Sequence, residues 1–325
     1  MKEYKISNLR KIKFFVKKVI HFFSIKIWVV SAEVGWSAFK KGWYKASRIV
    51  SIAVGKFKEN NCAISASDLT YYTLFAIVPF FAIAYGIALL FGLESILNNQ
   101  IHSALGGQGV LSENIIEFAQ KTISETKGGL ITVVASTIFL FAIFSMLGNI
   151  ETTMNRIWKV RKHRHFVRRL RDFLLFILIG PALLVIGSAS NIFISANIIN
   201  LLPEILQNSL RFFTNFLVPT VIFSLLFFII YQVMPNRSIR PRASFLAAIG
   251  AGVVFQIVQY NYFNIQMSIS AYNTIYGSFA ALPLLLIWLR MSWIIVLFGA
   301  ELAYGIEHER ELTSSQQSHP PSHNL

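Results

Sequence analysis

Six long apolar segments constrain this chain more than any other feature of its sequence. They cover residues 69–92, 130–150, 173–199, 216–234, 243–267 and 279–304. Each is long enough to cross about 30 Å of hydrocarbon as a helix that rises about 1.5 Å per residue. The first five contain no Lys, Arg, Asp or Glu. Because backbone polar groups inside a bilayer must be satisfied locally, such segments form helices. The sequence therefore predicts an all-α membrane protein with six transmembrane helices.

The composition favours the same class. Apolar residues make up 54% of the 325 residues, and the mean hydropathy is +0.56, both more than a soluble domain of this length needs for its core. Cys62 is the only cysteine, so no intrachain disulfide is expected. The first strongly apolar run follows a long basic segment without a cleavage-like site, so we expect no secretory signal peptide.

The distribution of basic residues predicts the orientation. Fourteen Lys and Arg lie in residues 1–68, eight in 151–172 and three in 235–242, whereas the three intervening loops hold only Lys121, Lys127 and Arg211. Lys and Arg mark cytoplasmic loops. Six spans with both termini in the cytoplasm satisfy this rule in every loop, which predicts a multi-pass membrane protein. Anionic lipid headgroups account for the net charge of +15 without a nucleic-acid partner.

The segments outside the spans carry different predictions. Residues 1–68 contain two basic stretches with helical periodicity, beginning near Leu9 and near Trp36, which predict amphipathic helices at the cytoplasmic interface. These helices serve either as an anchor or as a lid over the cytoplasmic mouth of the bundle. Residues 305–325 are expected to form a cytoplasmic tail, and the polar, proline-containing part from 311 onward is expected to be disordered. The transmembrane domain is thus predicted to span residues 69–304.

Arg290 is the one basic residue within the six apolar segments, and it lies near the middle of the last of them. A guanidinium at the middle of a bilayer costs about 2.5–3.5 kcal/mol on insertion scales unless protein or water meets it. We therefore expect Arg290 to face a bundle interior or a wet cavity, where it binds an anionic group of a substrate.

Four residues accompany Arg290 as candidate substrate-binding residues, namely Tyr72 with Pro79 and Tyr276 with Pro283. The segments Tyr72 to Pro79 and Tyr276 to Pro283 agree at Tyr, Phe, Ala and Pro in one register. Proline removes a backbone donor, and the freed carbonyl is tolerated where it lines a cavity. Matched breaks in oppositely directed helices are typical of an inverted arrangement around a midplane site. Chance agreement, and proline as an ordinary residue of membrane helices, are the alternatives.

A polar cluster is predicted at the cytoplasmic end of the second span. Asn149, Thr152, Thr153 and Arg156 share one helix face and, with Asp68 and Glu301, are candidates for a cytoplasmic vestibule. The alternative is a set of hydrogen bonds between helices. Gln256, Gln259, Tyr260 and Asn264 form a similar stripe in the fifth span, for which helix-to-helix hydrogen bonding is the favoured interpretation.

Several motifs together resemble the YihY/BrkB family of bacterial inner-membrane proteins, some of which were once labelled ribonuclease BN. They lie at 66–74 with Pro79, at 145–158, at 180–181, at 231–242, at 275–278, at 282–283, at Trp288 and at 299–302. The likeness covers about residues 35 to 308. It implies six membrane helices with cytoplasmic termini and no settled molecular activity. Arg290 departs from the family pattern, in which an aromatic residue is usual.

The residues do not support ribonuclease or other enzyme activity. Zinc-dependent nucleases need a His-x-His-x-Asp-His cluster, whereas this chain has His163-Arg164-His165 with no Asp-His beyond it. The other five histidines are scattered over loops and tails, so we expect no metal, no cofactor and no catalytic site. The acids nearest the spans are expected at the cytoplasmic boundary, which argues against a relay of buried carboxylates.

Two function classes follow from these observations. In the first, the protein is a transporter or flippase-like element for an anionic lipid or solute, with Arg290 meeting the charged group midway. In the second, it is a non-transporting scaffold whose basic cytoplasmic face recruits lipids or partners. Membrane lipids are the expected partners in both cases, and a homo-oligomer is compatible with both.

Overall fold

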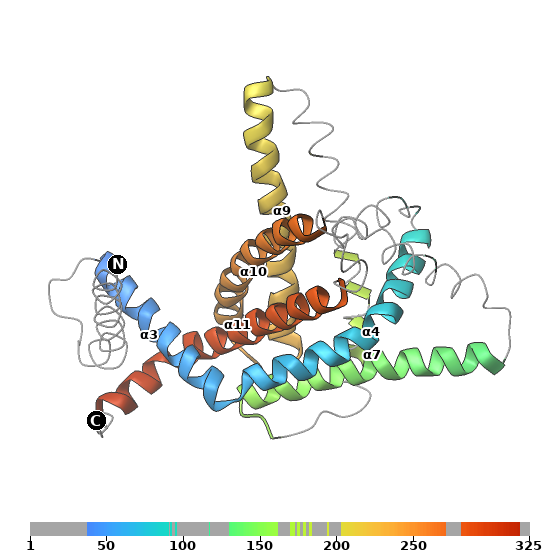
Figure 1. Cartoon of the computed structure of the whole chain (residues 1–325). Coiled ribbons are helices and arrows are strands. Elements are labelled where there is room, and N and C mark those ends of the chain that lie inside the picture. The colour runs from blue at the N-terminus through green and yellow to red at the C-terminus, as the bar shows by residue number, and fades with distance from the viewer. Residues whose placement is uncertain are drawn as a thin grey trace, which may run out of the picture.

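The computed structural model describes residues 38–90, 130–161, 203–270 and 281–318, with isolated positions between these ranges. The described part of the chain is helical and contains no strand. Its long helices are α3 (Ala38–Glu59), α4 (Cys62–Leu90), α7 (Leu130–Ile157), α9 (Glu204–Val233), α10 (Pro241–Ser270) and α11 (Ala281–Ser318) (Figure 1). The prediction of an all-α protein is confirmed for these residues.

Three helices are long and apolar enough to cross a membrane within the described residues. They are Thr214–Val233, Pro241–Ile265 and Leu282–Glu309, which coincide closely with the predicted spans at 216–234, 243–267 and 279–304. α4 and α7 cover the predicted spans at 69–92 and 130–150. The predicted span at 173–199, apart from isolated positions, and the first amphipathic stretch lie outside the described residues, so the six-span arrangement stays a prediction.

α11 occupies the centre of the described structure. It contacts α3, α4, α7, α9 and α10, while α4 pairs with α7 and α9 pairs with α10. In Figure 1, α4 and α7 run alongside each other and α3 crosses the C-terminal part of α11. Two hydrogen bonds of 2.9 Å hold α11: Trp293 Nε1 donates to Thr73 Oγ1 of α4, and the Tyr231 hydroxyl of α9 donates to the Val296 carbonyl.

Small residues let the helices approach α11 closely. Gly299, Ala300 and Ala303 are buried on it. A Cβ added at Gly299 would collide with the Tyr231 hydroxyl and would lie 2.8 Å from Ala251 Cβ. Close backbone approach of this kind is a common way to pack membrane helices, because lipid provides no hydrophobic force between them.

The C-terminal end of α11 is longer than the sequence predicts. The helix continues to Ser318, so residues 305–318 of the expected tail are helical, while residues 319–325 lie outside the described residues. Contacts with three other segments explain the extension. Tyr304 packs edge-on against Trp158 with 5.5 Å between ring centroids, Glu307 accepts from the Arg240 amide at 3.1 Å, and Glu309 lies 3.8 Å from Arg48.

The second amphipathic stretch forms α3, but its packing differs from that of a free surface anchor. Ile52 and Ala53 are buried, and the Ile49 carbonyl lies within 3.3 Å of a Cβ built at Gly305 of α11. α3 therefore packs along the extended end of α11. Its other face keeps apolar residues exposed, with Trp43 61% accessible.

The prolines do not interrupt the described helices. Pro219 lies inside α9, and α4 continues through position 79. Pro283 lies in the first turn of α11, where a missing N–H costs no intrahelical hydrogen bond.

Replacing Gly299 with Ala should destabilise the bundle by about 1–3 kcal/mol, because the added methyl group overpacks the contact with Tyr231 and Ala251. Gly250→Ala is the matched control, since a Cβ at Gly250 meets nothing within 4 Å. Thermal unfolding of the purified protein in detergent measures the difference. Equal melting temperatures for the two variants would contradict the close approach at Gly299.

Candidate functional site

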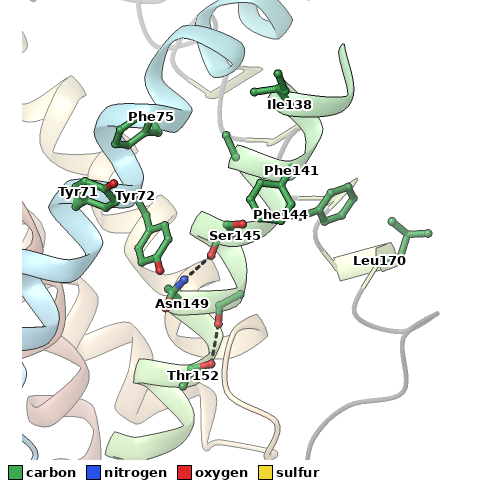
Figure 2. Close-up of a pocket in the computed structure, with 12 residues that line it drawn as sticks. Tyr71, Tyr72, Phe75, Ile138, Phe141, Phe144, Ser145, Asn149, Thr152 and Leu170 are labelled. Atoms are coloured by element: carbon green, nitrogen blue, oxygen red, sulfur yellow. Dashed lines mark hydrogen bonds between the residues drawn. The ribbon is translucent and has the colours of Figure 1, made fainter. Parts of the chain in front are cut away.

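A large groove lies between α4 and α7. Its volume is about 780 Å³. Tyr71, Tyr72 and Phe75 line it from α4, and α7 lines it with residues between Ile138 and Thr152 (Figure 2). The α7 positions 138, 141, 145, 149 and 152 recur at helical spacing, so a single face of α7 lines the groove.

The groove changes in chemistry along its length. One end is aromatic and aliphatic, with Phe75, Ile138 and Phe141 exposed to it. The other end is polar, with Ser145, Asn149 and Thr152. Figure 2 shows Phe75 and Ile138 at one end and Thr152 at the other. A groove graded in this way matches an amphipathic molecule, in which an apolar body adjoins a polar head.

The polar end is held rigidly by hydrogen bonds to the α7 backbone. Asn149 Nδ2 donates to the Ser145 carbonyl at 2.8 Å, and Thr152 Oγ1 donates to the Gly148 carbonyl at 2.8 Å. These bonds use only part of each side chain, so the Asn149 Oδ1 atom and the lone pairs of the Thr152 hydroxyl are still capable of accepting hydrogen bonds. The polar end can therefore bind hydrogen-bond donors of a ligand.

Arg156 lies one helical turn beyond Thr152 on α7. Its side chain is exposed, and its Nη1 atom donates to Ser65 Oγ of α4 at 3.1 Å. This hydrogen bond to a neutral hydroxyl fixes the guanidinium between the two helices and leaves its positive charge uncompensated by Ser65. Arginine presents several donors that suit phosphate and carboxylate groups. The polar end of the groove thus adjoins a site suited to an anion.

The structure brings together only part of the predicted vestibule. Asn149 and Thr152 line the groove with Tyr72, Arg156 follows them, and Thr153 is buried. Asp68 is exposed on α4 and Glu301 is fully buried, and neither lines the groove. Helical periodicity relates residues of one helix, but it does not specify which face of a neighbouring helix lies opposite.

Glu301 belongs to a separate buried cluster where α3, α4 and α11 meet. Its Oε1 atom accepts from Asn60 Nδ2 at 2.7 Å and from Cys62 Sγ at 3.4 Å. Asn60 reaches it from the turn between α3 and α4, in which Asn61 adopts a left-handed conformation with φ 52°, as asparagine tolerates. Burial, together with the neighbouring Glu301 carboxyl group, raises the pKa of the Cys62 thiol. These contacts indicate a structural junction.

Arg290 lines neither the α4–α7 groove nor the small hollow between α9 and α10. Its side chain is exposed on α11, as are those of Ile287 and Met291. The cavity expected around Arg290 therefore stays a prediction. Apolar neighbours along one helix reveal how costly a charge is, but not the direction in which it points. Pro283 is exposed near the start of α11, the side chain of Pro79 is not described, and Tyr276 lies outside the described residues.

The sequence interpretation missed the aromatic half of the groove. Tyr71 and Phe75 lie one turn apart on α4 with ring centroids 4.8 Å apart, and Phe141 is on the same face of α7 as Asn149. The helical spacing of Phe141, Ser145, Asn149 and Thr152 was available in the sequence. Aromatic residues are so common in membrane helices, however, that spacing alone does not single them out.

These observations define an all-helical membrane protein with a laterally placed groove between two of its helices. The match to the family model described as virulence factor BrkB, over residues 53–324, places the chain more narrowly. The chain belongs to this family, which confirms the resemblance found in its sequence motifs.

The curated relatives are named as membrane proteins and not as enzymes. The chain is 28% identical over 260 residues to a UPF0761 membrane protein of Alteromonas mediterranea, covering 79% of this chain and 87% of the relative. It is 31% identical over 280 residues to one of Acinetobacter baylyi, covering 82% of this chain and 63% of the relative. A third relative, a UPF0761 membrane protein of Pseudoalteromonas atlantica, is 26% identical over 288 residues. This match covers 86% of this chain and 92% of the relative. No solved structure matches the chain.

Cys62 should react slowly with maleimides in the folded protein, because only the thiolate reacts and the thiol is buried with a raised pKa. We expect labelling at pH 8 to be slower than that of an exposed cysteine by at least about a hundredfold. Ala63→Cys in a Cys62→Ser background is the matched control, since Ala63 is the exposed neighbour. Mass spectrometry of timed reactions gives both rates, and similar rates would contradict the closed junction at Glu301.

Proposed function

We propose that this membrane protein is a transporter or flippase-like element for an anionic lipid, and that the lipid binds in the groove between α4 and α7. The acyl region lies against the aromatic end, and the headgroup lies at the polar end beside Arg156. The single observation that supports this proposal is the gradient from Phe75 and Phe141 to Asn149 and Thr152, followed by an arginine.

A lipid suits this groove better than a water-soluble anion does. Tyr71, Phe75, Ile138 and Phe141 are each more than half exposed, so the aromatic end offers a large apolar surface. Burial of such surface is favourable for an acyl chain and offers little to a small hydrophilic solute. On the predicted orientation, the N-terminal end of α4 and the C-terminal end of α7 lie at the cytoplasmic leaflet, where anionic lipids and the basic loops attract each other.

Arg156 is suited to the headgroup for an electrostatic reason. In the part of the chain described, Arg48, Arg171 and Arg237 lie within 4 Å of acidic side chains. Arg156 instead donates a hydrogen bond to the Ser65 hydroxyl. A guanidinium held by a neutral partner retains its capacity to form charge-assisted hydrogen bonds with a phosphate. The groove therefore ends at a cation that a phospholipid headgroup can reach.

Replacing Arg156 with Gln should reduce the transbilayer movement of a fluorescent phosphatidylglycerol in proteoliposomes by at least about tenfold, because a hydrogen bond to a charged group contributes roughly 1.5–3 kcal/mol. Dithionite quenching of the labelled lipid measures the rate. Arg161→Gln is the matched control, since Arg161 is an exposed arginine beyond the end of α7. Movement of labelled phosphatidylcholine tests whether the effect is specific for anionic lipids.

The same assay separates this groove from the Arg290 hypothesis. Arg290→Tyr should leave the rate unchanged if the lipid uses the α4–α7 groove, whereas a midplane site at Arg290 predicts a loss of movement. If Arg156→Gln moves lipid as fast as the wild type, the groove does not bind the headgroup. If the wild-type protein moves no lipid faster than empty liposomes, transport is excluded under these conditions.

A second function, recruitment of lipids or partners by a non-transporting scaffold, is favoured by one observation on α3. Trp43, Val50 and Val54 are exposed at positions seven and four residues apart, so they share a helix face. The helix also carries Lys56 and Lys58 in its last turn. An apolar face with basic neighbours is typical of helices that lie on anionic membranes.

The scaffold function predicts that the basic N-terminal region is essential and that the groove is dispensable. A variant that lacks residues 1–34 should then fail to rescue a membrane phenotype of a deletion strain, while Arg156→Gln rescues it fully. The transport function predicts the reverse pattern. Rescue is measured as growth under membrane stress, with immunoblots of the membrane fraction as the control for insertion.

A further inference from the structure

Arg290 lies much closer to one end of its apolar stretch than to the other. In the stretch Leu282–Glu309 it is eight residues from the start and 19 from the end, or about 12 Å and about 28 Å along the axis. The far end of α11 is level with the basic loop before α10, because Glu307 accepts a hydrogen bond from the Arg240 amide at 3.1 Å. Arg290 is 17 residues, or about 25 Å, from Glu307. Since the hydrocarbon is only about 30 Å thick, Arg290 lies near its external edge on the predicted orientation.

The neighbouring helix α10 indicates a similar depth. Trp288, two residues before Arg290, packs on Tyr262 of α10 with 6.0 Å between ring centroids. Tyr262 is 21 residues beyond Pro241, where the apolar stretch of α10 begins, which is about 31 Å along the axis. Tryptophan and tyrosine are enriched where the hydrocarbon meets the headgroups. Both helices therefore place Arg290 just inside the external interface and away from the midplane.

The Arg290 guanidinium is accessible from outside the bundle. Arg290 is exposed, as are Ile287 and Met291 on the same helix face, and no hydrogen bond or ion pair joins it to a described residue. The Cα–Cβ bonds of a helix tilt toward its N-terminus, which for α11 is the external end on the predicted orientation. The long Arg290 side chain can therefore extend along the apolar face toward the headgroups.

The chemistry of this level favours a phosphate as the partner of the guanidinium. Residues 281–300 of α11 contain no Asp or Glu. A second copy packed through the same face would thus bring two guanidinium groups together without an acid between them. A phospholipid instead carries its phosphate at the interface, and arginine matches phosphate with paired, charge-assisted hydrogen bonds. Met291 offers an apolar surface to an acyl chain of the same lipid.

We infer that Arg290 is an anchor site for a phospholipid of the external leaflet, which it binds through the phosphate group. At this depth the guanidinium needs no cavity inside the bundle, because the headgroup region solvates it. On the predicted orientation the site lies across the bilayer from Arg156. It therefore requires neither the α4–α7 groove nor the movement of lipid.

Fluorescence quenching in phosphatidylcholine vesicles tests the depth. Bimane is attached to Met291→Cys in a Cys62→Ser background, since Cys62 is the one native cysteine. Leu225→Cys is the matched control, because Leu225 is also exposed and lies near the middle of the apolar stretch Thr214–Val233. A nitroxide at carbon 5 of the acyl chain lies near the interface, and one at carbon 12 lies deeper. The ratio of shallow to deep quenching should be higher for Met291→Cys than for Leu225→Cys.

Native mass spectrometry of the full chain with dioleoylphosphatidylglycerol tests the phosphate contact. An Arg156→Gln background removes the contribution of the α4–α7 groove to headgroup binding. In this background Arg290→Gln should retain one lipid fewer, with about tenfold weaker affinity for that lipid, because a hydrogen bond to a charged group is lost. Arg290→Lys should retain most of the binding. Met291→Ala, the matched control on the same face, should bind as the parent does, and binding of dioleoylglycerol, which lacks the phosphate, should not depend on Arg290.

Four results would overturn the inference. Equal quenching ratios at the two cysteine positions would place Arg290 at the midplane. Equal lipid binding by Arg290→Gln and its parent would show that water alone solvates the guanidinium. Competition by free inorganic phosphate as effective as that by a phospholipid would exclude a lipid site, and a dimer that Arg290→Gln abolishes would make this face a contact between two copies. None of these results depends on whether the protein moves lipid, so failure of the proposed function is distinguishable from failure of this inference.

Discussion

The close approach of helices to α11 at Gly299, Ala300 and Ala303 is the constraint on which the rest of the described structure depends. Apolar side chains gain little by leaving lipid for protein, so helices in a membrane associate through packing and hydrogen bonds. The absence of a side chain at Gly299 leaves room for the Tyr231 hydroxyl, which donates to the Val296 carbonyl. The missing side chain at Gly299 therefore permits both the close contact between α11 and α9 and the Tyr231–Val296 hydrogen bond that stabilises this contact.

The groove follows from how α4 is held on α11. The Thr73 hydroxyl accepts from Trp293 Nε1 and donates to the Leu69 carbonyl, so it bridges the two helices without an unsatisfied group. With this face of α4 bound to α11, the neighbouring face with Tyr71, Tyr72 and Phe75 is available to line a groove with α7. The Arg156–Ser65 hydrogen bond closes the contact between α4 and α7 at one end. The groove is thus a space between two helices that are tied together beyond its polar end.

Features that depend on a single segment were predictable from the sequence, whereas contacts between two segments were not. Uncharged apolar runs located the spans at 216–234 and 243–267 to within a few residues. The length needed to cross the hydrocarbon and the free-energy cost of a charge inside it are both properties of a single helix. The shared face of Asn149, Thr152 and Arg156 is likewise a property of one helix. The direction of Arg290, and the pairing of Glu301 with Asn60 some 241 residues away, depend on which helices become neighbours. No periodicity within a segment encodes that choice.

The charged residues near the C-terminal ends of α7 and α11 divide into two groups with different physical roles. Glu301, Glu307 and Glu309 are engaged with the turn before α4, with the loop before α10 and with α3. They connect segments to α11, and they explain why this helix continues beyond its apolar part. Arg156 instead contacts a hydroxyl group at the end of a groove. In a chain with a net charge of +15, acids are scarce, and those near α11 stabilise its junctions. Much of the positive charge is therefore not neutralised by acids. Arg156 places one such charge beside a groove with an apolar end.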